Sequence, residues 1–371
     1  MNDFETAWRE LAAGETRAWW AGPARAGLAA LSGIYGGIVC GYRAGFDLGL
    51  LRQTGLPCKV VSVGNITVGG TGKTTTVRWL VRRLVEWGLR PAVLSYGYRS
   101  EKRGSGVEIV SGPEGIRLMV EASGDEPQLL ARSLPGVPVL IGKKRIASGR
   151  VACKELGANV CVLDDAFQYW RLKKDLEIVL VSAANPFGYG RLLPRGMLRE
   201  PLRGLRRADA VIVTHADYLE PAKRAELSRE IAAWNPRALT AEAAHCASRL
   251  RDHATGDTVP LEVLREGRWL AVSSLGQPES FERTLKELGA HVAAAARFPD
   301  HHPYSEADLR AVSQRVDREG LAGVVTTEKD AVKIPAPWLA GVRCCVLEVD
   351  LRFLSGQDGL ESLIRSRLSA N

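Results

Sequence analysis

The chain has cysteines without a pattern and few aromatic residues. Its 371 residues include seven cysteines, no two of them in Cys-x-x-Cys spacing. The odd total argues against a disulfide framework and the spacing against a zinc site, which fits a reducing cytoplasm. Aromatic residues make up only 6%, and no helix-turn-helix, zinc-finger or RNA-binding signature accompanies the net charge of +8. Nucleic acid is therefore the least favoured acidic partner, behind a phosphorylated substrate or an anionic membrane surface.

An apolar run near the N-terminus is too short to predict a full membrane span. Residues 26 to 42 form 17 uncharged positions between Arg25 and Arg43, and five of them are glycine. As a helix they would reach about 25 Å, against a hydrocarbon core of roughly 30 Å. Acidic residues ahead of the run argue against a secretory signal. Trp and Tyr near its ends favour a helix at the membrane interface, and a helix packed on the protein's own core is the alternative.

A glycine-rich turn at residues 67 to 75 has the composition of a phosphate-binding loop. A β-branched run leads into it, and an amphipathic pattern follows it. Glycines allow positive φ, so that several N–H groups and the start of a helix can face one anion. The strict pattern has a glycine where this chain has Thr67. Lys73 would reach the phosphates and Thr74 a Mg²⁺ ion. The residues expected to bind nucleotide are Thr67, Val68, Gly69, Gly70, Thr71, Gly72, Lys73, Thr74 and Thr75.

Strand and helix patterns alternate after residue 58, which predicts an α/β fold with a doubly wound, mostly parallel sheet. The length allows two domains with separate cores. Expected strands cover residues 60–63, 91–95, 137–141, 160–163, 176–181 and 210–214, with helices after Lys73 and at 126–133 and 145–156.

Asp164 and Asp165 directly follow one of these apolar strands. Ligands bind beyond the carboxyl ends of strands in open α/β sheets, so we expect both carboxylates on the metal side of the phosphates. Two solvated turn acids are the alternative. Residues 191 to 207 add an arginine every fourth position, but Pro194 and Pro201 forbid a continuous helix. We expect a loop that gathers guanidinium groups around phosphates, with a merely solvated loop as the alternative.

Two further segments are ambiguous by themselves. Asp125 and Glu126 precede a helical pattern, where acids often serve only as caps or dipole partners. His301 and His302 are two of only six histidines, and no second His or Cys cluster nearby indicates a metal site.

Taken together and in order, the motifs resemble the tetraacyldisaccharide 4'-kinase family, the lipid A 4'-kinases of Gram-negative bacteria. The resemblance rests on residues 63–74, 124–127, 163–168, 193–201, 300–301 and 327–333. It implies ATP- and Mg²⁺-dependent phosphorylation of the 4'-hydroxyl of an acylated glucosamine disaccharide 1-phosphate lipid. It also implies a peripheral or monotopic location at the cytoplasmic face of the inner membrane. Ala166 and Tyr169 stand where the family usually has Gly and His.

The resemblance further implies a domain organisation. The N-terminal membrane-associating segment would cover residues 1–57, the P-loop kinase domain 58–237, a linker 238–249, a smaller α/β domain 250–345 and a C-terminal segment 346–371.

Roles for single residues also follow from the resemblance. Asp125 would accept the hydroxyl proton with His301 as its partner across the domain cleft, or His302 as the alternative. Asp165, Asp164 and Thr74 would hold the metal. Lys329 and Asp330 would hold the second domain together or approach the nucleotide. Residues expected to arrange the loop, substrate and metal are Asn65, Glu126, Arg199 and Glu200.

A soluble P-loop switch or metal-insertion NTPase that regulates a protein partner is the competing class. Its guanine-reading motif needs one residue between Lys and Asp, but Lys329 and Asp330 are adjacent. Val68 stands where signature-lysine switches have their lysine. The sequence therefore favours the lipid kinase and implies no obligate protein partner.

Overall fold

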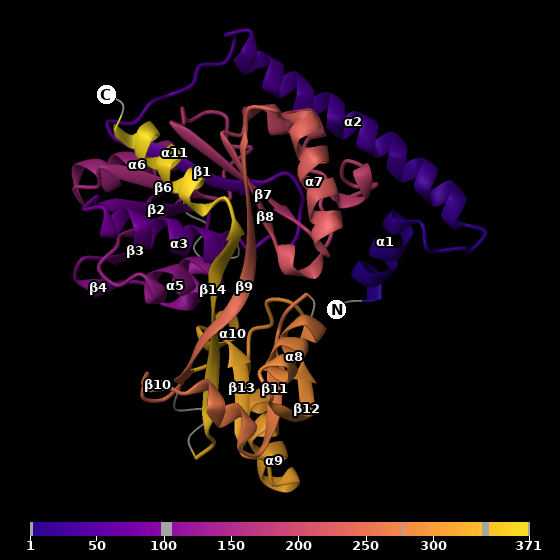
Figure 1. Ribbon diagram of the computed structural model, residues 1–371, viewed down its shortest axis with the longest axis vertical. Coiled ribbons are helices and arrows are strands. Elements are labelled where there is room, and N and C mark those ends of the chain that lie inside the picture. The colour runs from indigo at the N-terminus through magenta and orange to yellow at the C-terminus, as the bar shows by residue number, and fades with distance from the viewer. Residues whose placement is uncertain (1–2, 98–105, 277, 336–340, 370–371) are drawn as a thin grey trace.

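The computed structural model describes residues 3–97, 106–276, 278–335 and 341–369. Its strands form one continuous sheet in the order β12-β11-β13-β14-β9-β8-β7-β1-β6-β2-β5-β3-β4, with β10 paired to β9. Figure 1 shows a wide upper part, a smaller lower part and a long helix that projects from the upper part.

The strands are β1 Lys59–Asn65, β2 Pro91–Ser95, β3 Glu108–Gly112, β4 Gly115–Ile116, β5 Val139–Ile141, β6 Val160–Asp164, β7 Leu176–Ser182, β8 Ala210–Thr214, β9 Leu239–Asp252, β10 Thr258–Val259, β11 Arg268–Ser273, β12 His291–Arg297, β13 Gly323–Thr327 and β14 Cys344–Ser355. The α-helices are α1 Asp3–Ala13, α2 Ala21–Asp47, α3 Lys73–Glu86, α4 Val120–Ser123, α5 Asp125–Ser133, α6 Arg145–Lys154, α7 Pro221–Trp234, α8 Pro278–Glu287, α9 Glu306–Glu319, α10 Glu328–Ala331 and α11 Gln357–Ser369. Short 3₁₀ helices cover Gly188–Gly190, Leu202–Arg207, Ala216–Tyr218 and Leu261–Arg265.

The upper part is the predicted doubly wound sheet. Strands β8, β7, β1, β6, β2 and β5 run parallel to one another. Side chains alternate between the two faces of a strand, so Val61 and Val63 enter one core while Val60 enters another. Helices α3, α5 and α11 supply side chains to the first face. Helices α6 and α7 contribute to cores on the opposite face. Both faces are buried, as parallel sheets require.

The lower part contains the parallel strands β12, β11, β13 and β14. Helix α8 packs in one core beside them and α9 in another. Strands β9 and β14 are long and antiparallel, and they run from the lower part into the upper part (Figure 1). The expected linker 238–249 coincides mostly with β9. The domain boundaries themselves stay a prediction.

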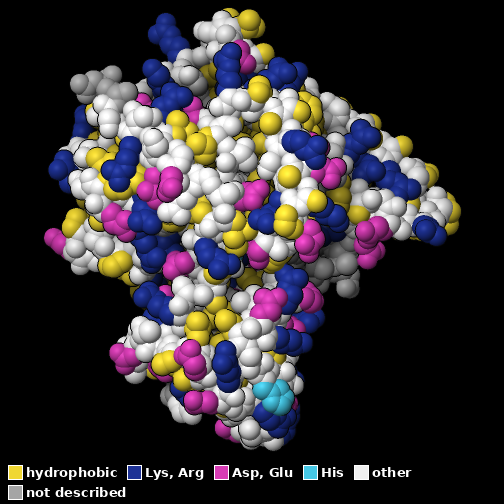
Figure 2. Space-filling model, viewed as in Figure 1, with side chains coloured by type: hydrophobic (Ala, Val, Ile, Leu, Met, Phe, Trp, Pro, Cys, Tyr) yellow, Lys and Arg dark blue, Asp and Glu magenta, His cyan; other side chains and the backbone are white. Residues whose placement is uncertain are grey.

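Helix α2 is longer than the uncharged run suggested. Its 27 residues correspond to about 40 Å, because the helix continues through Arg25 and Arg43. Within the described ranges it is the one helix long and apolar enough to cross a membrane. Only Ala21, Ser32 and Gly36 are buried, so it is not a core helix. Figure 2 shows hydrophobic and Lys/Arg side chains side by side on this projection.

Candidate functional site

The phosphate loop connects β1 to α3 at the carboxyl edge of the sheet. Gly69 and Gly72 have φ of 111° and 76°, in the region where side chains are strained. Gly72 is the N-cap of α3, and Lys73, Thr74 and Thr75 form the first turn. The backbone N–H groups at this helix start are available to an anion, and the helix dipole favours negative charge there.

Buried hydrogen bonds hold the loop from below. The Asn65 side-chain amide donates to Thr71 Oγ1 at 2.9 Å. Thr214 Oγ1 donates to the Thr71 carbonyl at 3.0 Å, and Gln168 Nε2 donates to the Asn65 carbonyl at 2.9 Å. Asn65 thus supports the loop rather than facing a ligand. These contacts hold the loop in a shape suited to phosphate.

The arginine-rich segment lies directly against this loop. The Val68 N–H donates to the Met197 carbonyl, and the Arg199 N–H donates to the Ile66 carbonyl, both at 2.8 Å. Not every arginine faces the phosphates. Arg207 makes two hydrogen bonds with the buried Glu200 carboxylate. Glu200 also accepts from Gln168, so its oxygens are occupied and it supports the segment from within.

Asp164 ends β6 and Asp165 follows it beside Lys73, and their environments differ. Asp165 Oδ1 lies 2.8 Å from Arg199 Nη1 and 3.9 Å from Lys73 Nζ. Burial raises the pKa of Asp165, but these cations outweigh it and the pKa lies below the ordinary value. Burial and the charges of Glu126 and Asp165 raise the pKa of Asp164 to about 7. Its Oδ1 is buried without a hydrogen-bond partner.

This carboxylate group suits a hard divalent cation. Mg²⁺ prefers oxygen ligands and is commonly held by one or two carboxylates together with substrate phosphates. The unsatisfied Asp164 Oδ1 and the mutual repulsion with Asp165 and Glu126 are the features that a cation would relieve. The residues present therefore fit a metal between the loop and β6.

The structure brings Asp125 and His301 together across a sequence separation of 176 residues. Asp125 is the first residue of α5, and its Oδ2 lies 2.9 Å from His301 Nδ1. Lys329 Nζ lies 3.2 Å from His301 Nε2, and Lys333 Nζ lies 3.9 Å from Asp125 Oδ2. Burial raises the pKa of Asp125, but the His301 hydrogen bond and the two lysine charges outweigh it and keep the pKa below its ordinary value.

This geometry selects one tautomer of His301. The Lys329 ammonium group only donates, so Nε2 accepts from it. Nδ1 then carries the proton and donates to Asp125. Asp125 is thus an ionised carboxylate that the imidazole orients, which is the state that a proton acceptor requires.

The neighbouring histidine has a different environment. His302 Nε2 lies 3.0 Å from Asp308 Oδ2, and the ring stacks on Phe298. Of the two candidate partners for Asp125, the structure places only His301 there. Asp330 is buried and bonds to Ser274 and Thr327, so it holds the lower part together, whereas Lys329 faces His301.

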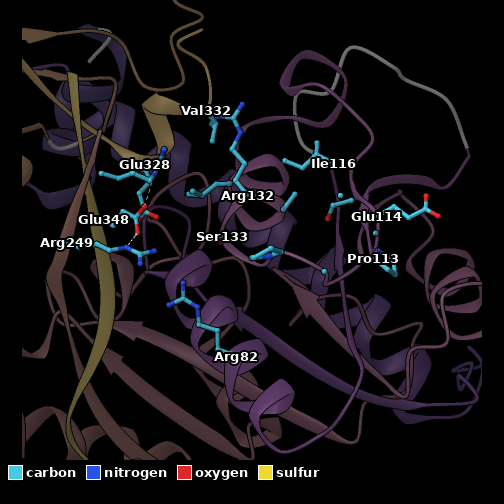
Figure 3. A pocket seen from close by; sticks show the side chains of 18 residues that line it. Arg82, Pro113, Glu114, Ile116, Arg132, Ser133, Arg249, Glu328, Val332 and Glu348 are labelled. Atoms are coloured by element: carbon cyan, nitrogen blue, oxygen red, sulfur yellow. Dashed lines mark hydrogen bonds and ion pairs between the residues drawn. The ribbon is translucent and has the colours of Figure 1, made fainter. Parts of the chain in front are cut away.

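A cavity of about 800 Å³ lies near the C-terminal half of α5. Figure 3 shows Arg82, Arg132 and Arg249 around it, with Arg249 paired to Glu348. None of the predicted site residues lines this cavity. It is therefore separate from the loop and the Asp125–His301 pair.

Sequence reasoning missed several contacts. It did not connect Lys333 with Asp125, although the Thr-Glu-Lys-Asp segment was recognised. It also argued against a metal-type cysteine cluster, yet the Sγ atoms of Cys58, Cys153 and Cys161 lie within 4.8 Å of one another. All seven cysteines are free thiols. These groups are distant in sequence, so no spacing rule could have found them.

Comparisons with known proteins identify the family of this chain. The sequence profile of the family described as tetraacyldisaccharide-1-P 4'-kinase matches residues 24–369. The tetraacyldisaccharide 4'-kinase of Anaeromyxobacter sp. (strain K) is 43% identical over 327 residues, which cover 88% of this chain and 86% of that protein. The Anaeromyxobacter sp. (strain Fw109-5) kinase is 39% identical over 95% of this chain and 96% of its own length.

A solved structure extends the likeness to the whole fold. The crystal structure of LpxK from Aquifex aeolicus in complex with ATP superposes with a TM-score of 0.75 at 30% identity. The match covers 93% of this chain and 99% of that one. With its phosphate loop, acidic strand end and Asp–His pair in one ordered set, this chain belongs to the tetraacyldisaccharide-1-P 4'-kinase family.

Proposed function

We propose that this protein transfers the γ-phosphate of ATP to the 4'-hydroxyl of a tetraacyldisaccharide 1-phosphate in lipid A biosynthesis. The observation that carries the proposal is the Asp125–His301 pair in a chain that also contains a phosphate loop at the start of α3. A P-loop switch has no need for a proton acceptor of this kind. The family match over residues 24–369 supports the same activity.

The chain's cations would neutralise charge on the transferring group. Phosphoryl transfer passes through a loose transition state, so positioning and electrostatics dominate. Lys73 would contact the β- and γ-phosphates and Arg199 would approach the γ-phosphate. In this structure both side chains interact with Asp165. Nucleotide would therefore exchange these ion pairs for contacts with phosphate.

Mg²⁺ would be held by Thr74, Asp165 and Asp164. The Glu126 carboxylate is close enough to Asp164 to interact with it electrostatically, so it would also feel the charge of the ion. A bound Mg²⁺ would supply positive charge that offsets the charge of the phosphates. Arg199 would be released from Asp165 for the substrate.

Asp125 would accept the proton of the 4'-hydroxyl, and His301 would orient the carboxylate through its Nδ1–H. Lys329 would hold the imidazole in that tautomer. A proton transfer of this type is typically worth about 10² to 10⁴ in rate.

We also propose the domain division 1–57, 58–237, 238–249, 250–345 and 346–371, with closure of the smaller domain completing the site. Asp125 lies on α5 of the upper part, and His301 follows β12 of the lower part. Strands β9 and β14 are the connection about which such a movement would occur.

The lipid acceptor requires a membrane surface, and α2 supplies a suitable contact. Leu31, Ile34 and Ile38 are 54–65% exposed and recur at helical spacing. The opposite side of α2 is tied to the kinase. Ser32 donates to the Leu192 carbonyl, and Tyr35 donates to the Arg199 carbonyl, both at 2.8 Å.

These ties favour a helix that lies in the interface of the cytoplasmic leaflet over one that crosses it. A helix held along one side by its own catalytic part cannot also be surrounded by lipid. The Arg199 segment would thereby sit between the membrane helix and the phosphate loop, where a lipid headgroup would meet ATP.

The proposal is tested by following transfer of labelled γ-phosphate to tetraacyldisaccharide 1-phosphate in mixed micelles. We expect Lys73→Ala and Asp125→Asn to lose about 10² or more in rate, and His301→Ala to follow Asp125→Asn. His302→Ala should retain most of the activity, because His302 contacts Asp308 instead. A wild type that binds ATP, transfers nothing to lipid and hydrolyses ATP only with a protein partner would replace this proposal with the switch.

The membrane proposal has its own test. The double change Ile34→Asn/Ile38→Asn should abolish flotation of the protein with vesicles containing anionic lipid, while activity on micellar acceptor survives. The control Val85→Asn alters another exposed apolar residue, on α3. Equal flotation of all three proteins would contradict an interfacial role for α2.

A further inference from the structure

A histidine from the connecting strand β9 contacts the phosphate loop. His245 Nε2 lies 2.7 Å from Thr75 Oγ1, although the two residues are 170 positions apart. Thr75 Oγ1 also donates to the Gly72 carbonyl at 2.9 Å. The hydroxyl of Thr75 is thus held from two sides at the point where the loop becomes helix α3.

The imidazole ring also packs against the loop backbone. A Cβ on Gly72 would lie only 2.4 Å from His245 Cε1 and Nε2. On its other side His245 stacks on His215, with ring centroids 4.4 Å apart and an interplanar angle of 29°. His215 Nδ1 in turn lies 3.3 Å from Ser182 Oγ at the end of β7. Two of the chain's six histidines, His215 and His245, therefore pack between the sheet and the phosphate loop.

The hydrogen bonds fix the protonation of His245. The Thr75 hydroxyl has one proton, and the Gly72 carbonyl can only accept it. Nε2 therefore carries a proton and donates to Thr75 Oγ1, which leaves Nδ1 as a bare acceptor. Nδ1 is indeed shielded from solvent without a partner, and a stranded acceptor is less costly than a stranded N–H. Burial lowers the pKa of His245 to about 3, so the ring is neutral at physiological pH.

We propose that His245 is a positioning residue for ATP: it fixes the Thr75 hydroxyl and the end of the phosphate loop and thereby sets nucleotide affinity. The inference rests on the proposed ATP-dependent reaction and adds a residue that no motif of the phosphate loop contains. Thr75 is in the first turn of α3, where backbone N–H groups face a bound phosphate. A loop held in its binding shape avoids the cost of ordering when ATP binds.

The location of His245 gives this contact a second consequence. Strand β9 pairs with β8 in the upper part and with β14 along the connection to the lower part. His245 is paired opposite Leu351 of β14. The end of the phosphate loop is thus hydrogen-bonded directly to β9. Strands β9 and β14 form the connection to the lower part, which contains His301.

The test measures ATP binding directly by calorimetry and compares three substitutions of His245. His245→Gln places a side-chain N–H near the position of Nε2, whereas the Asn side chain is too short to reach it. We expect His245→Ala and His245→Asn to weaken ATP binding about tenfold, as for one lost hydrogen bond, and His245→Gln to stay within about threefold of wild type. The KM for the lipid acceptor should be unchanged in all three.

A double-mutant cycle with Thr75→Val identifies the route of the effect. If His245 acts through Thr75, then adding His245→Ala to Thr75→Val produces little further loss of ATP affinity. Full additivity would overturn the proposal, as would wild-type ATP affinity in His245→Ala or an equal loss in His245→Gln. If His245→Ala does not fold, the comparison of His245→Asn with His245→Gln still decides the question: equal ATP affinity in these two proteins would overturn the proposal. A wild type that binds no ATP would refute the proposed function itself.

Discussion

A buried ion pair connects the helix of the phosphate loop with the segment that contacts His301, and its removal should destabilise the protein strongly. Arg78 on α3 lies 2.6 Å from Glu328 on α10, and their side chains are only 3% and 9% exposed. Arg78 also donates to the Val349 carbonyl, and the Val349 N–H donates to Glu328. Arg78→Met leaves the Glu328 carboxylate buried and without its cation.

The magnitude follows from the burial of both partners. Removing one partner of a buried pair typically costs 3 to 5 kcal/mol. Glu328 keeps one backbone hydrogen bond at 3.2 Å, so we expect the lower end, about 3 kcal/mol. Since every 1.4 kcal/mol is a factor of ten, this lowers the folding equilibrium constant about 150-fold. Lys329, next to Glu328, would lose its fixed position beside His301, so kcat should fall as well.

The same helix contains a matched control. Arg82 lies one turn further along α3 and pairs with Asp350 at 3.2 Å, but both side chains are 40% or more exposed. An exposed pair contributes about 0 to 1 kcal/mol, so Arg82→Met should shift the urea midpoint little. Urea unfolding followed by fluorescence, together with kcat under native conditions, measures both effects. Equal midpoint shifts in Arg78→Met and Arg82→Met would refute the reasoning from burial.

Two further predictions concern the loop and its acidic neighbours. Gly72→Ala should abolish ATP binding measured by calorimetry, because φ is 76° and the new Cβ would collide with His245. Gly55→Ala, outside the loop and with open space around it, should bind ATP, and similar losses in both would contradict this. The raised pKa of Asp164, about 7 when folded, means that its contribution to stability is present below pH 4 and is lost as pH rises toward 7. Without divalent cations the urea midpoint should therefore fall between pH 5 and 7, and Asp164→Asn should reduce that slope; an unchanged slope would show that Asp164 does not titrate there.

The boundaries of strands and helices show how far the sequence could predict secondary structure. The strands at 160–163 and 210–214 were placed within one residue, because both are short apolar runs bounded by turns. The expected strand at 137–141 begins at Val139 instead, after Pro138, which lacks a backbone donor. Helix α2 extends beyond its apolar run, since arginines are good helix formers and its ends are not marked by composition.

In the candidate site, the sequence predicted groups of residues that are close together in the chain, but it did not predict which distant side chains contact one another. The phosphate loop could be identified because glycines, Lys73 and Thr74 act together within a few residues. The resemblance led to Asp125 and His301 as partners, and the structure decided that His302 lies against Asp308 instead. No local pattern indicated that Lys333 approaches Asp125 or that Glu200 is occupied by Arg207 and Gln168.

The sequence by itself determined the fold class, the phosphate loop and the membership in a kinase family, because these depend on periodicity and on residues close together in the chain. Only the tertiary structure decided which side chains meet across the sheet and between its two parts. His245 reaches Thr75 and Arg78 reaches Glu328 because β9, α3 and α10 pack together. Such contacts depend on the register and packing of distant segments, which no local spacing encodes.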